Sequence, residues 1–305
     1  MSGSGHGKKA IAAAFLANLG IAIAKFIGFL ITRSSSLLAE SVHSLADTGN
    51  QGLLLLGDRR ASRHADEQHP FGYSRERYFW AFVVALVLFI GGAVFAIYEG
   101  VEKIRHPHEI ESPAVAIAIL VLGVGLEGFS FTTAMREAAP LRQGRSWFRF
   151  IRESRSPELP VVLLEDSGAL VGLVIALAGV VLATTTEHPI FDGIGTLTIG
   201  LLLALIAVVL AVEMKSLLIG EAATTADTDA IRRALAADAS VVGVIHLRTE
   251  HLGPDDVLVA TKLAFRPKLT VAELAAAIDA AEVRVRAAVP AARLIYIEPD
   301  LQRSS

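Results

Sequence analysis

The chain has 305 residues, of which 53% are hydrophobic and only 19% are charged, and its mean hydropathy is +0.52. Soluble domains carry about 25% charged residues, so this balance is typical of a membrane protein with several spans. The net charge of −3 gives no reason to expect nucleic acid as a partner, and the absence of cysteine excludes disulfides, thiolate metal ligands and thiol catalysis.

Long apolar runs alternate with charged segments along the first two thirds of the chain. A helix needs about 20 residues to cross the hydrocarbon core of a bilayer, and six runs are long enough. The first is too long for the apolar core of a signal peptide and lacks an obvious cleavage site, so we interpret it as a span. The predicted spans lie near residues 9–31, 36–58, 78–101, 113–136, 158–183 and 190–214.

Lysine and arginine are concentrated on one side of these predicted spans. They gather at the N-terminus and in the segments 59–77 and 136–155, whereas the other side carries few. Because positively charged loops stay in the cytoplasm, we expect a multi-pass protein of the cell membrane with both termini cytoplasmic.

The second span carries polar side chains in an otherwise apolar stretch. His43, Asp47 and Asn50 are spaced i, i+4 and i+7, so they share one face of a helix. Ionisable groups at membrane depth are costly and by default indicate an ion site or a proton relay. Helix capping or hydrogen bonding between helices is the structural alternative for these residues.

The fifth span contains the adjacent carboxylates Glu165 and Asp166. One aspartate at the centre of a span costs about 2.5–3.5 kcal/mol, so both side chains are expected to face the interior of the helical bundle. They lie about 100° apart around the helix and cannot both point squarely at one ion without local distortion. Asp166 is the natural complement to His43 and Asp47.

The composition changes after Leu218, and we expect a membrane domain over 1–218 and a separate soluble domain over 219–305. Patterning within the soluble domain predicts the order helix, strand, strand, helix, strand, which is a ferredoxin-like αββαβ arrangement. The predicted elements are a helix at 227–237, strands at 241–249 and 257–265, a helix at 271–289 and a strand at 293–298.

Together, these features resemble the cation diffusion facilitator family of zinc-transporter-type metal/proton antiporters. The resemblance rests on six spans, His-x-x-x-Asp in the second, the acids of the fifth, the αββαβ domain, and two further segments, Asp66–Tyr73 and Leu217–Glu221. It implies a homodimer and a tetrahedral transport site in the bilayer, formed by one pair of ligands from the second span and one pair from the fifth.

Carried over to this sequence, His43 and Asp47 form the first pair, and Asp166 belongs to the second. The remaining position is Val162, which cannot bind metal. Glu165 is the favoured substitute for this fourth ligand. The alternatives are that water or Asn50 fills the fourth position, or that the ion is bound by three protein ligands. The family's loop site would use Asp66 and His69, with Tyr73 where a third ligand is expected.

The family's cytoplasmic metal site looks largely absent here, because Ile245, Tyr296 and Glu298 stand where its ligands would align. The soluble domain is therefore expected to serve dimerisation.

The resemblance and the site chemistry imply a divalent cation/proton antiporter that exports its substrate from the cytoplasm by alternating access. Zn²⁺ is the leading substrate, and Mn²⁺, Fe²⁺, Co²⁺ and Cd²⁺ also suit these ligand types. A non-transporting membrane metal sensor with the same fold is the first alternative, supported by the valine at position 162. A membrane hydrolase is the second, but the sequence has no nucleophile motif and no His-Glu-x-x-His signature. We therefore do not expect an enzyme.

Overall fold

The computed structural model describes residues 19–142, 144 and 146–301. By their contacts, the described residues up to Arg59 and Phe79–Met214 form one compact unit, and Arg60–Tyr78 with Lys215 onward form the other. The loop Arg60–Tyr78 therefore packs with the C-terminal unit. Part of the first predicted span, residues 9–18, lies outside the described residues.

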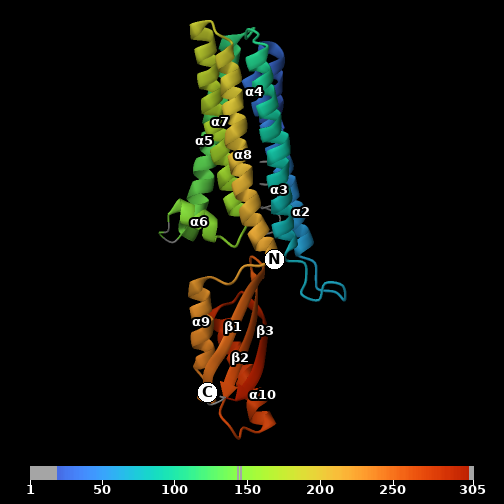
Figure 1. Ribbon diagram of the computed structural model, residues 1–305, viewed down its shortest axis with the longest axis vertical. Coiled ribbons are helices and arrows are strands. Elements are labelled where there is room, and N and C mark those ends of the chain that lie inside the picture. Colours follow the sequence, from blue (N-terminus) through green and yellow to red (C-terminus); the bar gives the residue numbers. More distant parts are fainter. Residues whose placement is uncertain (1–18, 143, 145, 302–305) are drawn as a thin grey trace, which may run out of the picture. The chain divides into compact units, whose positions relative to one another are not determined.

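The first unit is a bundle of long helices (Figure 1). It contains a helix described over Leu19–Thr32, the π-helical segment η1 (Leu88–Val94), α4 (Phe95–Arg105), α5 (Pro113–Arg142), α6 (Trp147–Glu153) and α7 (Glu158–Thr186). It also contains most of α2 (Ser35–Ala61), α3 (Glu76–Val87) and α8 (Ile190–Ile219).

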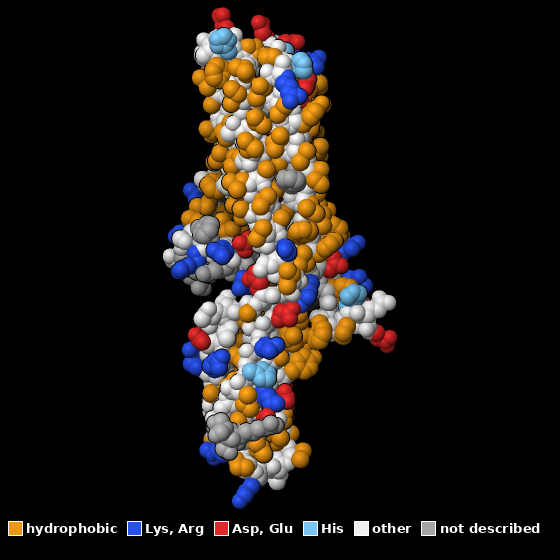
Figure 2. All heavy atoms as spheres, viewed as in Figure 1, with side chains coloured by type: hydrophobic (Ala, Val, Ile, Leu, Met, Phe, Trp, Pro, Cys, Tyr) orange, Lys and Arg blue, Asp and Glu red, His pale blue; other side chains and the backbone are white. Residues whose placement is uncertain are grey.

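Within the described residues, four helices combine the length and the apolar composition needed to cross a membrane: Glu76–Arg105, Pro113–Thr133, Pro160–Thr186 and Ile190–Ile219. The described part of the first helix is shorter, and α2 is more polar than the other four. The polar residues of α2 point inward, since Glu40, His43, Ser44 and Asn50 are all buried. Hydrophobic side chains cover most of the visible face of the bundle, and Lys and Arg gather around α6 (Figure 2).

The position of α2 is fixed at its first turn by a residue of α8. The carboxylate of Asp192 accepts hydrogen bonds from the backbone N–H of Ser35 at 3.0 Å and from the hydroxyl of Ser34 at 3.1 Å. A carboxylate at a helix N-terminus satisfies free N–H groups and complements the helix dipole. This cap sets the start of α2, so His43, Asp47 and Asn50 follow two to four turns further along the bundle.

Glycine allows α7 to approach its neighbours closely. A side-chain carbon added at Gly172 would lie 2.8 Å from Oε1 of Glu40 on α2, and one added at Gly168 would lie 2.6 Å from Ile206 on α8. Small residues commonly have this role between membrane helices. The close approach brings the carboxylates of α7 toward α2.

The second unit contains the predicted αββαβ order. Its three-stranded sheet has the order β1-β2-β3, with β1 antiparallel to β2 and β2 parallel to β3. The elements are α9 (Thr225–Ala236), β1 (Val241–Gly253), β2 (Asp256–Phe265), α10 (Val271–Ala288) and β3 (Ala292–Leu301).

The core of this domain lies between the helices and one face of the sheet. Ile231 of α9, Val259 and Leu263 of β2, and Val285 of α10 are completely buried in it. Each such side chain contributes roughly 1.5–3 kcal/mol by leaving water. Thr270 and Glu273 form a reciprocal capping box that begins α10.

Candidate metal transport site

The predicted second-span residues lie on the buried side of α2. His43 is 1% exposed, and its Nε2 lies 3.6 Å from Oδ2 of Asp47, one turn away. Neither nitrogen of His43 has a hydrogen-bond partner among the described residues, and neither does Oδ1 of Asp47. Buried polar atoms without partners are uncommon in folded proteins, which makes these groups candidates for binding a ligand.

The fifth-span carboxylates are held by different neighbouring helices. The side-chain amide of Asn50 on α2 donates to Oε1 of Glu165 at 2.6 Å. The hydroxyl of Ser130 on α5 donates to Oδ2 of Asp166 at 3.3 Å. The two adjacent carboxylates of α7 are thus oriented toward two different helices, as expected from their separation of about 100° around the helix.

A small cavity of about 30 Å³ joins three of the predicted residues, Asp47, Glu165 and Asp166. The same cavity is lined by six residues outside the predicted set: Ile21, Ser44, Gln51, Glu127, Ser130 and Val162. His43 and Asn50 do not line it but contact Asp47 and Glu165, which do.

The expected tetrahedral cluster is not assembled in this arrangement. Across the described part of the chain, no three His, Asp or Glu side chains stand close enough to hold one ion together. The structure brings carboxylates of α2, α5 and α7 to one cavity, and ion binding would require them to draw closer.

A buried ion pair borders the cavity and joins the first helix to α2. The ammonium of Lys25 lies 3.2 Å from Oε2 of Glu40 and donates to the hydroxyl of Ser44 at 2.7 Å. Both charged side chains are almost fully buried, at 2% and 0% exposure. The sequence shows each charge, but their pairing becomes visible only when the two helices pack together.

The loop residues Asp66 and His69 form a small structure with Tyr73. One oxygen of Asp66 accepts from the backbone N–H of His69 at 2.8 Å, and the other accepts from the hydroxyl of Tyr73 at 2.5 Å. The Tyr73 hydroxyl and the His69 backbone together lower the pKa of Asp66, and the Asp66 carboxylate raises the pKa of Tyr73. An ion at this loop would have to displace these bonds.

In the soluble domain, the aligned position Glu298 is already paired with Lys262 at 2.8 Å. His251 is 4% exposed, and its Nδ1 lies 3.2 Å from the carbonyl oxygen of Gly253. These contacts give both residues a structural explanation.

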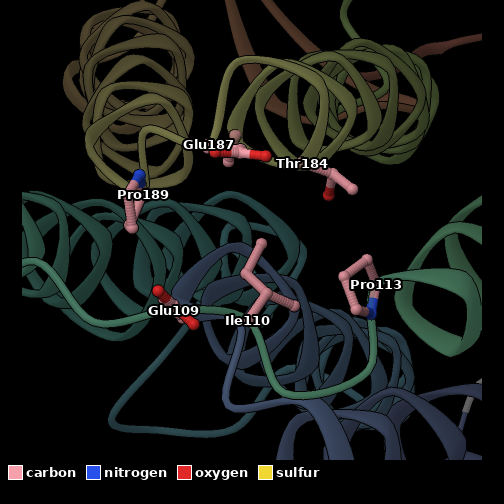
Figure 3. A pocket seen from close by; sticks show the side chains of 7 residues that line it. Glu109, Ile110, Pro113, Thr184, Glu187 and Pro189 are labelled. Atoms are coloured by element: carbon pink, nitrogen blue, oxygen red, sulfur yellow. The ribbon is translucent and has the colours of Figure 1, made fainter.

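A larger cavity of about 310 Å³ lies at the other end of the bundle, where the loop before α5 meets the turn between α7 and α8 (Figure 3). Glu109 and Glu187 line it together with Thr184 and two prolines. Both carboxylates were outside the predicted site. Figure 3 shows them on opposite sides of the opening.

Comparison with known proteins covers almost the whole chain. Residues 11–219 match the family described as cation efflux transmembrane domain, and residues 223–300 match the cytoplasmic domain of cation efflux proteins. The human protein named proton-coupled zinc antiporter SLC30A9, mitochondrial, is 33% identical over 231 residues, which are 75% of this chain and 41% of that protein.

Two further relatives come from a plant and a bacterium. Metal tolerance protein C4 of Arabidopsis thaliana is 30% identical over 87% of this chain and 59% of its own length. Magnetosome protein MamB of Paramagnetospirillum magneticum is 26% identical over 93% of this chain and 90% of its own length. The chain thus spans less than two thirds of the human and plant relatives.

The two domain matches cover the membrane helices and the αββαβ domain in the expected order. They identify a multi-pass membrane protein of a cation efflux family. The chain belongs to the cation diffusion facilitator family.

Proposed function

We propose that this protein is a divalent cation/proton antiporter, with Zn²⁺ as its leading substrate. The observation that carries the proposal is the cavity between α2, α5 and α7, where Asp47, Glu165 and Asp166 meet inside the membrane domain. The printed name of the human relative, a proton-coupled zinc antiporter, supports the choice of ions. Mn²⁺, Fe²⁺, Co²⁺ and Cd²⁺ are the other ions compatible with these ligands.

The proposed ligands are Asp47, Glu165 and Asp166, with His43 joining from the neighbouring turn of α2. Asn50 holds Glu165 in place through its amide hydrogen bond. Drawing His43 and the carboxylates together around the ion would complete a site with nitrogen and oxygen ligands, as zinc prefers. The loop pair Asp66 and His69 is a second, separate candidate for metal binding.

Proton coupling follows from the ligand chemistry. A divalent ion needs neutral imidazole and ionised carboxylates, so metal and protons compete for the same atoms. If only the metal-loaded and the protonated forms change conformation, inward proton movement drives export from the cytoplasm. Helix rocking around a site inside the bilayer provides alternating access.

The proposal also covers the location and the oligomeric state of the protein. The distribution of Lys and Arg supports a cell-membrane protein with both termini in the cytoplasm. The match to the family's cytoplasmic domain supports a homodimer.

The proposal is tested by zinc uptake into proteoliposomes with an imposed pH gradient. The native protein should transport zinc only with the gradient, and Asp166→Ala should reduce flux to that of empty liposomes. Val174→Ala is the matched control, because Val174 lies on α7 and is 51% exposed on the outside of the bundle. The opposite outcome is a protein that binds zinc, manganese, iron or cobalt without a gradient and transports none of them. That result would contradict transport and favour the non-transporting metal sensor.

A further inference from the structure

The inference concerns the ligand position that is lost at Val162, and it rests on the proposed function. Val162 stands one turn before Asp166 on α7, and both side chains line the small cavity. An isopropyl group offers no lone pair, so this wall of the cavity cannot contact a cation favourably. Glu165, the substitute on α7 itself, accepts a hydrogen bond from Asn50. A further ligand would come from another helix that reaches the same cavity.

The side chain of Glu127 on α5 reaches this cavity. It lines the cavity together with Asp47, Glu165 and Asp166. Ser130, three residues further along α5, donates its hydrogen bond to Asp166. Residues three apart share one face of a helix, so the face that carries Glu127 is turned toward the carboxylates of α7.

A structural salt bridge with Lys25 is the competing explanation for Glu127. The ammonium of Lys25, however, is already bound to Glu40 and Ser44, at 3.2 and 2.7 Å. A carboxylate within a membrane span is expensive and usually has a functional reason.

Two further observations point to a ligand at this place. Oδ1 of Asp47, a residue of the cavity wall, is buried without a hydrogen-bond partner among the described residues. The imidazole of His43 is 1% exposed, lies 3.6 Å from Asp47 and makes no hydrogen bond at either nitrogen with any residue that the structure describes. The cavity of about 30 Å³ also has room for a single small particle, since about 10–15 Å³ already holds one water.

We propose that Glu127 is a ligand of the transported cation and supplies the donor that is missing at Val162. The substrate site then takes ligands from α2, α5 and α7, and it is richer in carboxylate oxygen than a site built from α2 and α7 alone. Oxygen-rich sites suit Mn²⁺ and related hard ions better than imidazole-rich sites do. Among the ions compatible with the site, the proposal therefore favours Mn²⁺ beside Zn²⁺.

The test is a calorimetric titration of the full-length protein in detergent with Mn²⁺ and, separately, with Zn²⁺. Glu127→Gln keeps the shape and removes the charge, and it should weaken binding at least about tenfold. Glu111→Gln is the control, because Glu111 is an exposed loop carboxylate outside the cavity. Its binding should equal that of the native protein.

The decisive variant is the double substitution Glu127→Gln with Val162→Asp. It moves the carboxylate to the position on α7 where the family places a ligand, and it should restore most of the lost affinity. A purely structural role of Glu127 gives no reason for such a rescue. If Glu127→Gln does not fold, Glu127→Asp and the double variant carry the comparison.

The outcomes separate the two proposals. Native affinity in Glu127→Gln, or no recovery in a folded double variant, overturns the role of Glu127 and leaves antiport intact. Affinity that falls and recovers as expected, in a protein that shows no flux in proteoliposomes, upholds Glu127 and overturns antiport. A native protein that binds neither ion overturns both.

Discussion

The membrane domain contains a buried pair of opposite charges. Lys25 and Glu40 come from two helices and are almost completely shielded, at 2% and 0% exposure. Taking two such ions out of water costs several kcal/mol each, and their attraction offsets that cost only while both partners are present. Oε1 of Glu40 already lacks a hydrogen-bond partner among the described residues, so this carboxylate depends on Lys25.

Lys25→Met should therefore destabilise the protein strongly, by about 3–5 kcal/mol, because it leaves the Glu40 carboxylate buried without its cation. The double substitution of Lys25 and Glu40 by Met should recover most of the loss, since an apolar pair of similar size needs no compensation. Thermal unfolding of the full-length protein in detergent measures both changes. A double variant as unstable as Lys25→Met would show that the ion pair itself is not the cause.

Whether a residue of the candidate site can be predicted from the sequence depends on whether its role is set within one helix or between helices. His43, Asp47, Glu165 and Asp166 could be predicted because each is a polar residue in an apolar run, and helical spacing relates the members of each pair. Glu127 and Lys25 also stand out in apolar runs, but their roles depend on which helix faces them. The packing of the helices determines which side chains Glu127 and Lys25 contact, and residue spacing along one helix does not reveal it.

At the scale of elements, glycine determines how closely the membrane helices pack. A side-chain carbon added at Gly100 of α4 would lie 2.5 Å from the backbone nitrogen of Leu197 on α8. Backbone cannot rotate away as a side chain can, so the two helices would have to separate. A carbon added at Gly125 of α5 would meet nothing within 4 Å.

Gly100→Ala should lower stability by about 1–3 kcal/mol, the usual cost of overpacking a tight contact. Gly125→Ala is the matched control in another membrane helix, and it should be neutral or stabilising by up to about 1 kcal/mol, because alanine favours the helix. The midpoint of thermal unfolding, followed by tryptophan fluorescence in detergent, compares the two. Equal midpoints would contradict the assignment of α4 and α8 as a glycine-mediated contact.

The helices and strands themselves were largely predictable, with differences at particular places. The sixth predicted span, 190–214, continues as α8 to Ile219, because the apolar pattern extends through Leu217 and Leu218. The short helix α6 was not predicted; its position is fixed by Phe150 packing with Ala138 and Leu163 of the neighbouring helices. The π-helical turn η1 was also missed, since it differs from an α-helix in hydrogen bonding and not in sequence pattern.

At the scale of the whole molecule, the proposed homodimer needs a surface for association. The helices α9 and α10 pack on one face of the sheet in the soluble domain, where Ile295 and Ile297 contribute to the core. Alternation along β3 turns Tyr296 to the other face, where its side chain is 55% exposed. Val242 of β1 is exposed as well, at 48%.

An aromatic residue on an uncovered sheet face is a natural anchor for a partner, since tyrosine is enriched among the residues that dominate binding energy. Stable interfaces bury about 800 Å² on each partner, and a charge that becomes buried there without a partner is costly. Tyr296→Asp should therefore shift the protein toward the monomer. Mass determination by light scattering after size-exclusion chromatography in detergent measures the shift.

Val283→Asp is the matched control for this prediction, because Val283 is a comparably exposed apolar residue, at 65%, on α10. It lies on the element that covers the opposite face of the sheet, so it should leave the mass unchanged. If Val283→Asp alone dissociates the protein, the dimer forms through the helices of the soluble domain. If the native protein has the mass of a dimer and neither variant changes it, the membrane domain holds the two copies together, and the soluble domain contributes little to assembly. A native protein with the mass of a monomer would contradict the proposed homodimer.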